Sequence, residues 1–68
     1  MDNWKLIYRS ETLASASIVK GMLEENNVPV SLINKQDSSY INFGEIELYV
    51  PAAFTQTAND LLTQHSPE

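Results

Sequence analysis

Three short stretches of the chain have the side-chain patterns of β-strands: the first and third alternate from one residue to the next, and the second is apolar and β-branched. They run from Trp4 to Arg9, from Val28 to Ile33 and from Glu45 to Val50. In the first stretch, Trp4, Leu6 and Tyr8 alternate with Lys5, Ile7 and Arg9. In the third, the side expected to face the core carries Ile46, Leu48 and Val50, and the opposite side carries Glu45, Glu47 and Tyr49. Pro29 suits an edge strand, because proline lacks the N–H that an inner strand needs.

Apolar residues recur at helical spacing in two further segments. The first begins at Leu13 and places Ala16, Val19 and Leu23 on one side. Ser10 or Thr12 can cap its N-terminus, and Asn26-Asn27 suits its C-terminal cap. In the second segment Pro51 suits the first turn, and the apolar stripe consists of Phe54, Ala58, Leu61 and Leu62. From these patterns we expect the most buried residues to be Val19, Leu23, Ile46, Leu48, Leu61 and Leu62.

The order β-α-β-β-α predicts an α+β fold of one domain, residues 4–64, with a short tail at 65–68. A right-handed crossover makes the first two strands parallel, and the third then fits between them, antiparallel to both. This is a ferredoxin-like sandwich with a three-stranded sheet of order 1-3-2 and two helices on one face. Because the usual fourth strand is absent, we expect the first strand to be an open edge. Residues 34–44 are polar and read as a loop or a hairpin arm.

Composition narrows the classes of function. The 68 residues carry nine acidic and four basic side chains, a formal charge of −5, and no cysteine. This acidity opposes nucleic-acid binding, which needs clustered Lys and Arg. No apolar run reaches the roughly 18 residues of a membrane span, and the N-terminus lacks a secretory signal, so we expect a cytoplasmic protein without a membrane partner. A chain this short has a thin core, and association with a second copy is a common remedy.

The residues that usually carry chemistry are isolated in this chain. His65 is the single histidine, and one histidine without Cys or a second His is a poor metal site. The two glycines are too far apart for a phosphate-binding loop. Glu45 and Glu47 are best explained as cross-strand partners of Lys5 and Arg9 if the first and third strands are neighbours. We therefore expect no enzymatic activity, no catalytic residue, no metal and no cofactor.

Two groups of residues resemble a known family. The first group is Ile7-Tyr8, Ala16, Lys20-Gly21-Met22-Leu23 and Asn27-Val28-Pro29-Val30; the second is Leu48-Tyr49-Val50-Pro51, Ala58 and Leu61-Leu62. Over residues 4–62 the chain resembles the small bacterial family called putative prokaryotic signal-transducing proteins, a domain of unknown function. That family is similar in fold to PII signalling proteins, which place an effector loop between strands two and three. The resemblance implies a signalling role and gives Asn34–Gly44 the place of that loop.

Aromatic side chains are the candidates for contact with a partner or ligand, because Trp and Tyr often anchor interfaces. They are Trp4 on the predicted edge strand and Tyr40 and Phe43 in the 34–44 loop. Each can instead complete the small core. We expect a non-enzymatic regulatory or protein-interaction module that acts through the open edge and this loop. The alternatives are a sensor that binds a small metabolite beside the loop, and a structural accessory domain without a ligand.

A homodimer through the first strand is a further expectation. Antiparallel pairing of two copies would extend the sheet to six strands and satisfy the exposed backbone groups. The residues of this candidate dimer edge are Lys5, Ile7 and Arg9. Lys5 or Arg9 of one chain could then approach Asp2 or Glu11 of the other. The same two cations are also the kind of charge that keeps a strand edge solitary.

Overall fold

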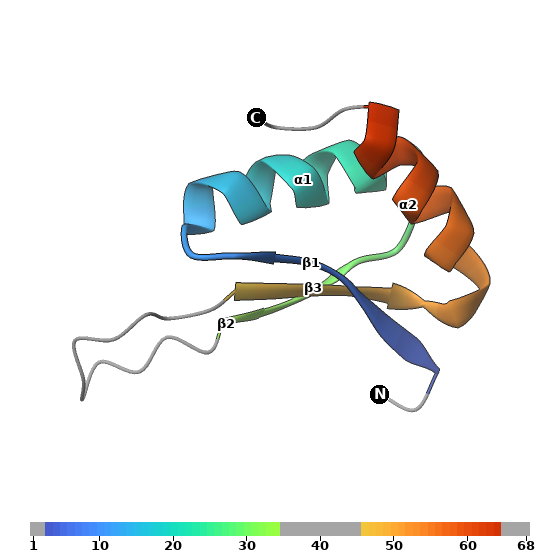
Figure 1. The fold of residues 1–68 in the computed structure, drawn as a ribbon, viewed down its shortest axis with the longest axis horizontal. Coiled ribbons are helices and arrows are strands. Elements are labelled where there is room, and N and C mark those ends of the chain that lie inside the picture. Colours follow the sequence, from blue (N-terminus) through green and yellow to red (C-terminus); the bar gives the residue numbers. More distant parts are fainter. Residues whose placement is uncertain (1–2, 35–45, 65–68) are drawn as a thin grey trace.

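Two helices cover one face of a three-stranded sheet (Figure 1). The structure is a computed structural model, and it describes residues 3–34 and 46–64. Its elements are β1 (Trp4–Ser10), α1 (Leu13–Glu25), β2 (Ser31–Asn34), β3 (Ile46–Pro51), the 3-10 turn η1 (Ala52–Phe54) and α2 (Thr55–Gln64). β3 lies between β1 and β2 and runs antiparallel to both. The predicted α+β architecture, its element order and the 1-3-2 sheet are confirmed.

Both ends of α1 follow from local sequence. Thr12 is the N-cap, and its hydroxyl accepts a hydrogen bond from the N–H of Ser15 at 3.3 Å. At the other end, Asn26 is the C-cap and Asn27 has a φ of 65°, the left-handed conformation that asparagine tolerates better than most residues. The N–H of Val28 then donates to the carbonyl of Leu23, which turns the chain back toward the sheet. The predicted helix bounds are confirmed because both caps are encoded next to the helix.

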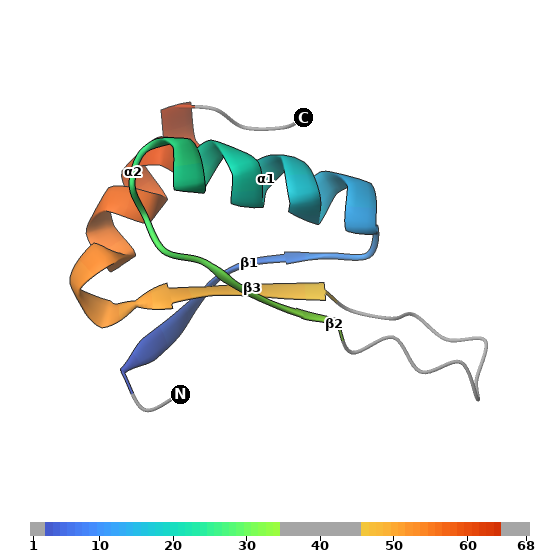
Figure 2. The same cartoon turned by 180° about the vertical axis from the view of Figure 1, so that it is seen from behind.

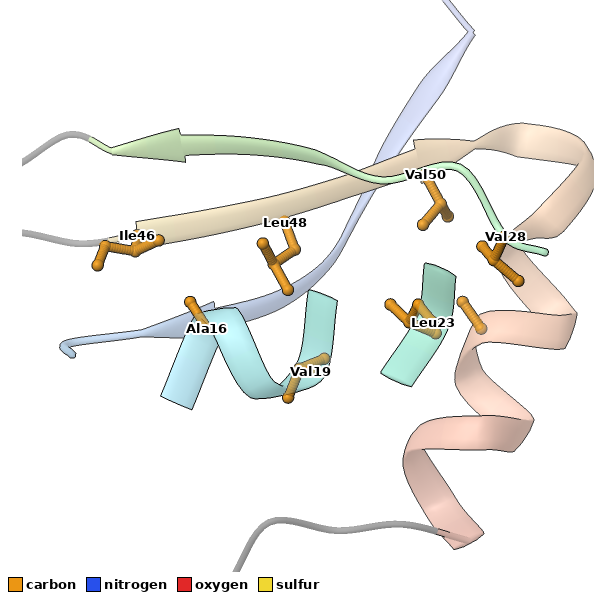
Figure 3. Close-up of a cluster of buried hydrophobic side chains, with 8 residues drawn as sticks. Ala16, Val19, Leu23, Val28, Ile46, Leu48 and Val50 are labelled. Carbon is orange, nitrogen blue, oxygen red and sulfur yellow. The ribbon is translucent and has the colours of Figure 1, made fainter. Parts of the chain in front are cut away.

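The core lies between β3 and α1 (Figure 3). Side chains from the inner face of β3 point toward α1, and Val28 closes the end near Val50. The fully buried residues are Ala16, Val19, Leu23, Val28, Ile46, Leu48, Val50 and Ala58. Leu61 and Leu62 only pack against this core and stay partly exposed, so their prediction as most buried residues is wrong. The reason is that α2 leaves the end of β3 and rises beside α1 (Figure 2), so Ala58 is the residue of α2 that reaches the core.

β1 does not keep the strict alternation predicted for it. Its pairing with β3 shifts register between Leu6 and Tyr8, so Ile7 is an extra residue, a β-bulge. Ile7 and Tyr8 both pack against the core. Beyond the bulge, Arg9 is opposite Glu47, on the face of the sheet without helices. The expectation that Lys5, Ile7 and Arg9 share one side of the strand is therefore wrong.

Two element boundaries also differ from expectation. β2 begins at Ser31 and includes Asn34, so residues 28–30 precede the strand and Asn34 is not part of a loop. Pro51 ends β3 instead of starting a helix, and η1 separates it from α2. Proline is tolerated there because Pro51 lies beyond the β2 pairing, which ends at Tyr49 opposite Ser31, so no ladder bond needs its N–H. Residues 35–44 of the predicted loop, and Glu45 of the predicted third strand, lie outside the described residues.

Candidate functional site

The outer side of β1 is an uncovered strand edge, which we call the β1 edge (Trp4–Ser10). Within the described ranges β1 is hydrogen-bonded to β3 alone, and no strand follows it in the sheet. The N–H of Ala52 donates to the carbonyl of Asn3 at 2.6 Å. Hydrogen-bonded and non-hydrogen-bonded pairs alternate along an antiparallel ladder, and this bond marks Asn3 and Ala52 as a hydrogen-bonded pair. The pairs of Trp4 with Pro51 and of Leu6 with Tyr49 are therefore non-hydrogen-bonded. The N–H and C=O groups of Trp4 and Leu6 therefore point outward, toward the place of a further strand.

A shallow hollow of about 340 Å³ lies along this edge at the bulge, lined by Leu6, Ile7, Tyr8 and Arg9. Leu6 is 39% exposed, so its side chain is accessible to a strand or ligand at this edge. A small-molecule site normally encloses its ligand on several sides. Here four consecutive residues of one strand form the lining, a shape that fits an extended chain laid along the strand better than an enclosed ligand.

A polar cluster of Arg9, Glu47 and Tyr49 lies beside this hollow, on the face of the sheet without helices. The Tyr49 hydroxyl donates to Glu47 Oε1 at 2.9 Å, and Arg9 Nη2 is 3.6 Å from Glu47 Oε2. The side chain of Glu47 is only 5% exposed, whereas that of Arg9 is 53% exposed. A buried carboxylate needs a cation or hydrogen-bond donors to offset the loss of water. The cluster therefore fixes Arg9 at the rim of the hollow while leaving half of its surface accessible.

The predicted site residues fall into two groups. Trp4 lies half-buried at the start of β1, Lys5 is exposed opposite Val50, and Ile7 and Arg9 line the hollow from opposite faces of the strand. The predicted cross-strand pair of Arg9 and Glu47 is confirmed, while Lys5 has no acidic residue opposite it in β3. Tyr40, Phe43 and His65 lie outside the described residues.

Sequence reasoning missed two features of this site, the bulge at Ile7 and the burial of Glu47. The one signal for the second is that Tyr49, which can donate a hydrogen bond, follows two residues after Glu47 on the same face of the strand. No signal for the bulge exists in residues 4–10 alone, since it is defined by the register against β3.

The described part of the chain, residues 3–34 and 46–64, holds no group of three or more His, Cys, Asp or Glu side chains arranged to bind a metal ion. None of its helices has the length and apolar character needed to cross a membrane. On the outer surface of α1, Leu13 is 51% and Ile18 66% exposed, and Lys20 is paired with Glu24 at 3.0 Å.

Comparison with known proteins gives one match. A family model described as putative prokaryotic signal transducing protein covers residues 4–66, nearly the whole chain. Neither the curated proteins nor the solved structures contain a significant match. The matched region includes every strand and helix described above, and with them the whole β1 edge.

Proposed function

We propose that this chain, which belongs to the family described as putative prokaryotic signal transducing protein, is a non-enzymatic protein-interaction module that acts through the β1 edge. The main support for this proposal is that the backbone groups of Trp4 and Leu6 face outward beside the hollow along Leu6–Arg9. Unpaired strand edges are templates for an added strand, and several recognition domains bind peptides in this way. The family description supports a role in signalling without naming a partner.

The outward N–H of Leu6 allows a selective test. Proline at this position removes that donor but no bond of the β1–β3 ladder, since Leu6 is in a non-hydrogen-bonded pair. Leu6→Ala is the matched control, because it trims the side chain and keeps the N–H. We expect tagged wild-type protein to retain a partner from native lysate, identified by mass spectrometry, Leu6→Ala to retain less of the same partner because the hollow loses part of its lining, and Leu6→Pro to lose it. Circular dichroism checks that all three proteins are folded.

A variant on another surface makes the test decisive. Ile18 lies on α1 and, at 66% exposed, is the most exposed of the large hydrophobic side chains in the described residues. The buried side of the same helix carries Ala16, Val19 and Leu23 instead. Ile18→Asp is expected to leave partner capture unchanged. If the partner is lost with Ile18→Asp and kept with Leu6→Pro, then α1 and not the β1 edge is the working surface.

A small-metabolite sensor is the second candidate function. It is favoured by the volume of the hollow, about 340 Å³, which lies within the roughly 300–1,000 Å³ range of ligand pockets. A thermal-shift screen of nucleotides and common metabolites separates the two functions. A shift of Tm by several degrees with one compound, lost in Arg9→Gln, would favour the sensor. Partner capture without any thermal shift would favour the interaction module, and neither result would favour a structural accessory domain.

A further inference from the structure

We infer that the β1 edge takes an extended segment of another protein that carries an acidic residue and, two positions later, an aromatic or branched aliphatic residue. This inference rests on the proposed function and adds the chemistry of the partner. It is based on β3, the strand already paired with β1, and on which β3 side chains lie opposite the residues of β1.

β3 acts as the template for the motif. On the helix-free face, Glu47 is opposite Arg9 and Tyr49 is opposite Leu6. Read along β3, this is an acidic residue, one intervening residue and an aromatic residue. The bulge at Ile7 makes this match possible, because it brings Leu6 and Arg9 to the same face at the separation of two residues in a regular strand. A regular antiparallel strand on the outer side of β1 meets the same two side chains in the same order.

Charge on β1 favours an acidic segment. Among Trp4–Ser10 the charged residues are Lys5 and Arg9, and none is acidic. Arg9 lines the hollow, its guanidinium side chain is 53% exposed, and Lys5 is exposed on the strand. The chain as a whole is acidic, with a formal charge of −5, but repulsion from distant carboxylates is screened beyond about 8 Å at physiological salt. Arg9 already contacts Glu47 at 3.6 Å, but its guanidinium carries five N–H donors and its side chain is 53% exposed, so it can also bind a carboxylate on a strand added opposite it.

A second copy of this chain fits the same edge less well. An antiparallel pairing of two copies along this edge would bring the bulge at Ile7 of one copy against the same irregular strand of the other, so neither copy offers the regular strand that β1 meets in β3. Bulges, Lys and Arg are also the devices by which edge strands avoid pairing with their own kind. Self-pairing is thus the competing occupant, and the experiment must separate it from an acidic partner.

The test titrates three short synthetic peptides into the ¹⁵N-labelled chain and follows the amide shifts by NMR at physiological ionic strength. The peptides are identical except for a central Glu-Val-Tyr, Gln-Val-Tyr or Lys-Val-Tyr. We expect the Glu peptide to shift the amides of Trp4–Ser10 and to bind about tenfold more tightly than the Lys peptide, with the Gln peptide between them, from one favourable cross-strand charge pair replaced by an unfavourable one. In Arg9→Gln the three affinities should converge; should that variant unfold, the wild-type comparison decides alone.

Other outcomes overturn the inference. Equal affinity of the three peptides at the β1 edge would remove the acidic preference, and the proposed function would stand. Shifts confined to another surface, or no binding by any peptide, would remove the motif, and the Leu6→Pro and Leu6→Ala comparison would then judge the proposed function separately. A mass of twice 7.6 kDa by light scattering, reduced by Leu6→Pro, would identify a second copy as the occupant of the edge.

Discussion

Glu47 offers the sharpest test of how the helix-free face is held together. We expect Glu47→Ala to lower the free energy of unfolding by about 2–3 kcal/mol. The hydrogen bond from Tyr49 at 2.9 Å is charge-assisted and supplies about 1.5–3 kcal/mol of this. The ion pair with Arg9 adds at most about 1 kcal/mol, because Arg9 is half exposed and its charge is rehydrated when its partner is removed.

Glu24 supplies the matched control. Its carboxylate lies 3.0 Å from Lys20 Nζ, closer than the 3.6 Å between Glu47 and Arg9, but its side chain is 48% exposed. Exposed pairs of this i,i+4 kind contribute about 0.3–0.5 kcal/mol. We therefore expect Glu24→Ala to cost less than about 0.5 kcal/mol. The two variants separate the effect of burial from that of distance, because the shorter ion pair is the more exposed one and is expected to contribute less to the free energy of unfolding.

The measurement is urea unfolding, followed both by far-ultraviolet circular dichroism and by fluorescence of Trp4, the single tryptophan. At about 0.05–0.15 kcal/mol per residue, 68 residues give a total stability of about 3–10 kcal/mol, so a loss of 2–3 kcal/mol moves the midpoint clearly. Glu47→Gln keeps an acceptor for Tyr49 and should fall between Glu47→Ala and wild type. Equal losses for Glu47→Ala and Glu24→Ala would refute the reasoning that burial of the carboxylate sets its contribution.

The remaining predictions concern the core and the ends of α1. Leu48→Ala should cost about 2–5 kcal/mol because Leu48 is fully buried, whereas the partly exposed Leu61→Ala should cost clearly less; equal urea midpoints would show that β3 is not the centre of the core. Thr12→Ala should cost about 1 kcal/mol through the lost N-cap, and Thr63→Ala, whose hydroxyl bonds only within α2, should be nearly neutral in thermal melts. Asn27→Ala should cost about 1 kcal/mol and Asn27→Gly close to none, because φ is positive there; equal urea midpoints for Asn27→Ala and wild type would contradict this.

Much of the fold could be predicted because its determinants are local in the sequence. The hydroxyl of Thr12 and the left-handed Asn27 lie within one turn of the α1 termini, so the ends of this helix are encoded by residues beside them. The alternation in 46–50 shows which side of β3 faces the core, since successive side chains of a strand point to opposite faces. The order of elements and the right-handed crossover then leave few ways to arrange three strands, and the 1-3-2 sheet is the economical one.

The properties of the candidate site were decided by tertiary structure. Periodicity shows which side of α2 is apolar, but how deeply Leu61 and Leu62 are buried depends on the direction in which α2 leaves β3 (Figure 1). The bulge at Ile7 arises because β1 has one residue more than the β3 segment opposite it. The residues of β1 after the bulge therefore point to the opposite face from the one that strict alternation predicts. Glu47 is an ordinary solvent-facing residue in the strand pattern, and it is buried because Arg9 and Tyr49 come to lie beside it. A single strand encodes its own alternation, whereas register and burial belong to a pair of strands and arise only when those strands meet.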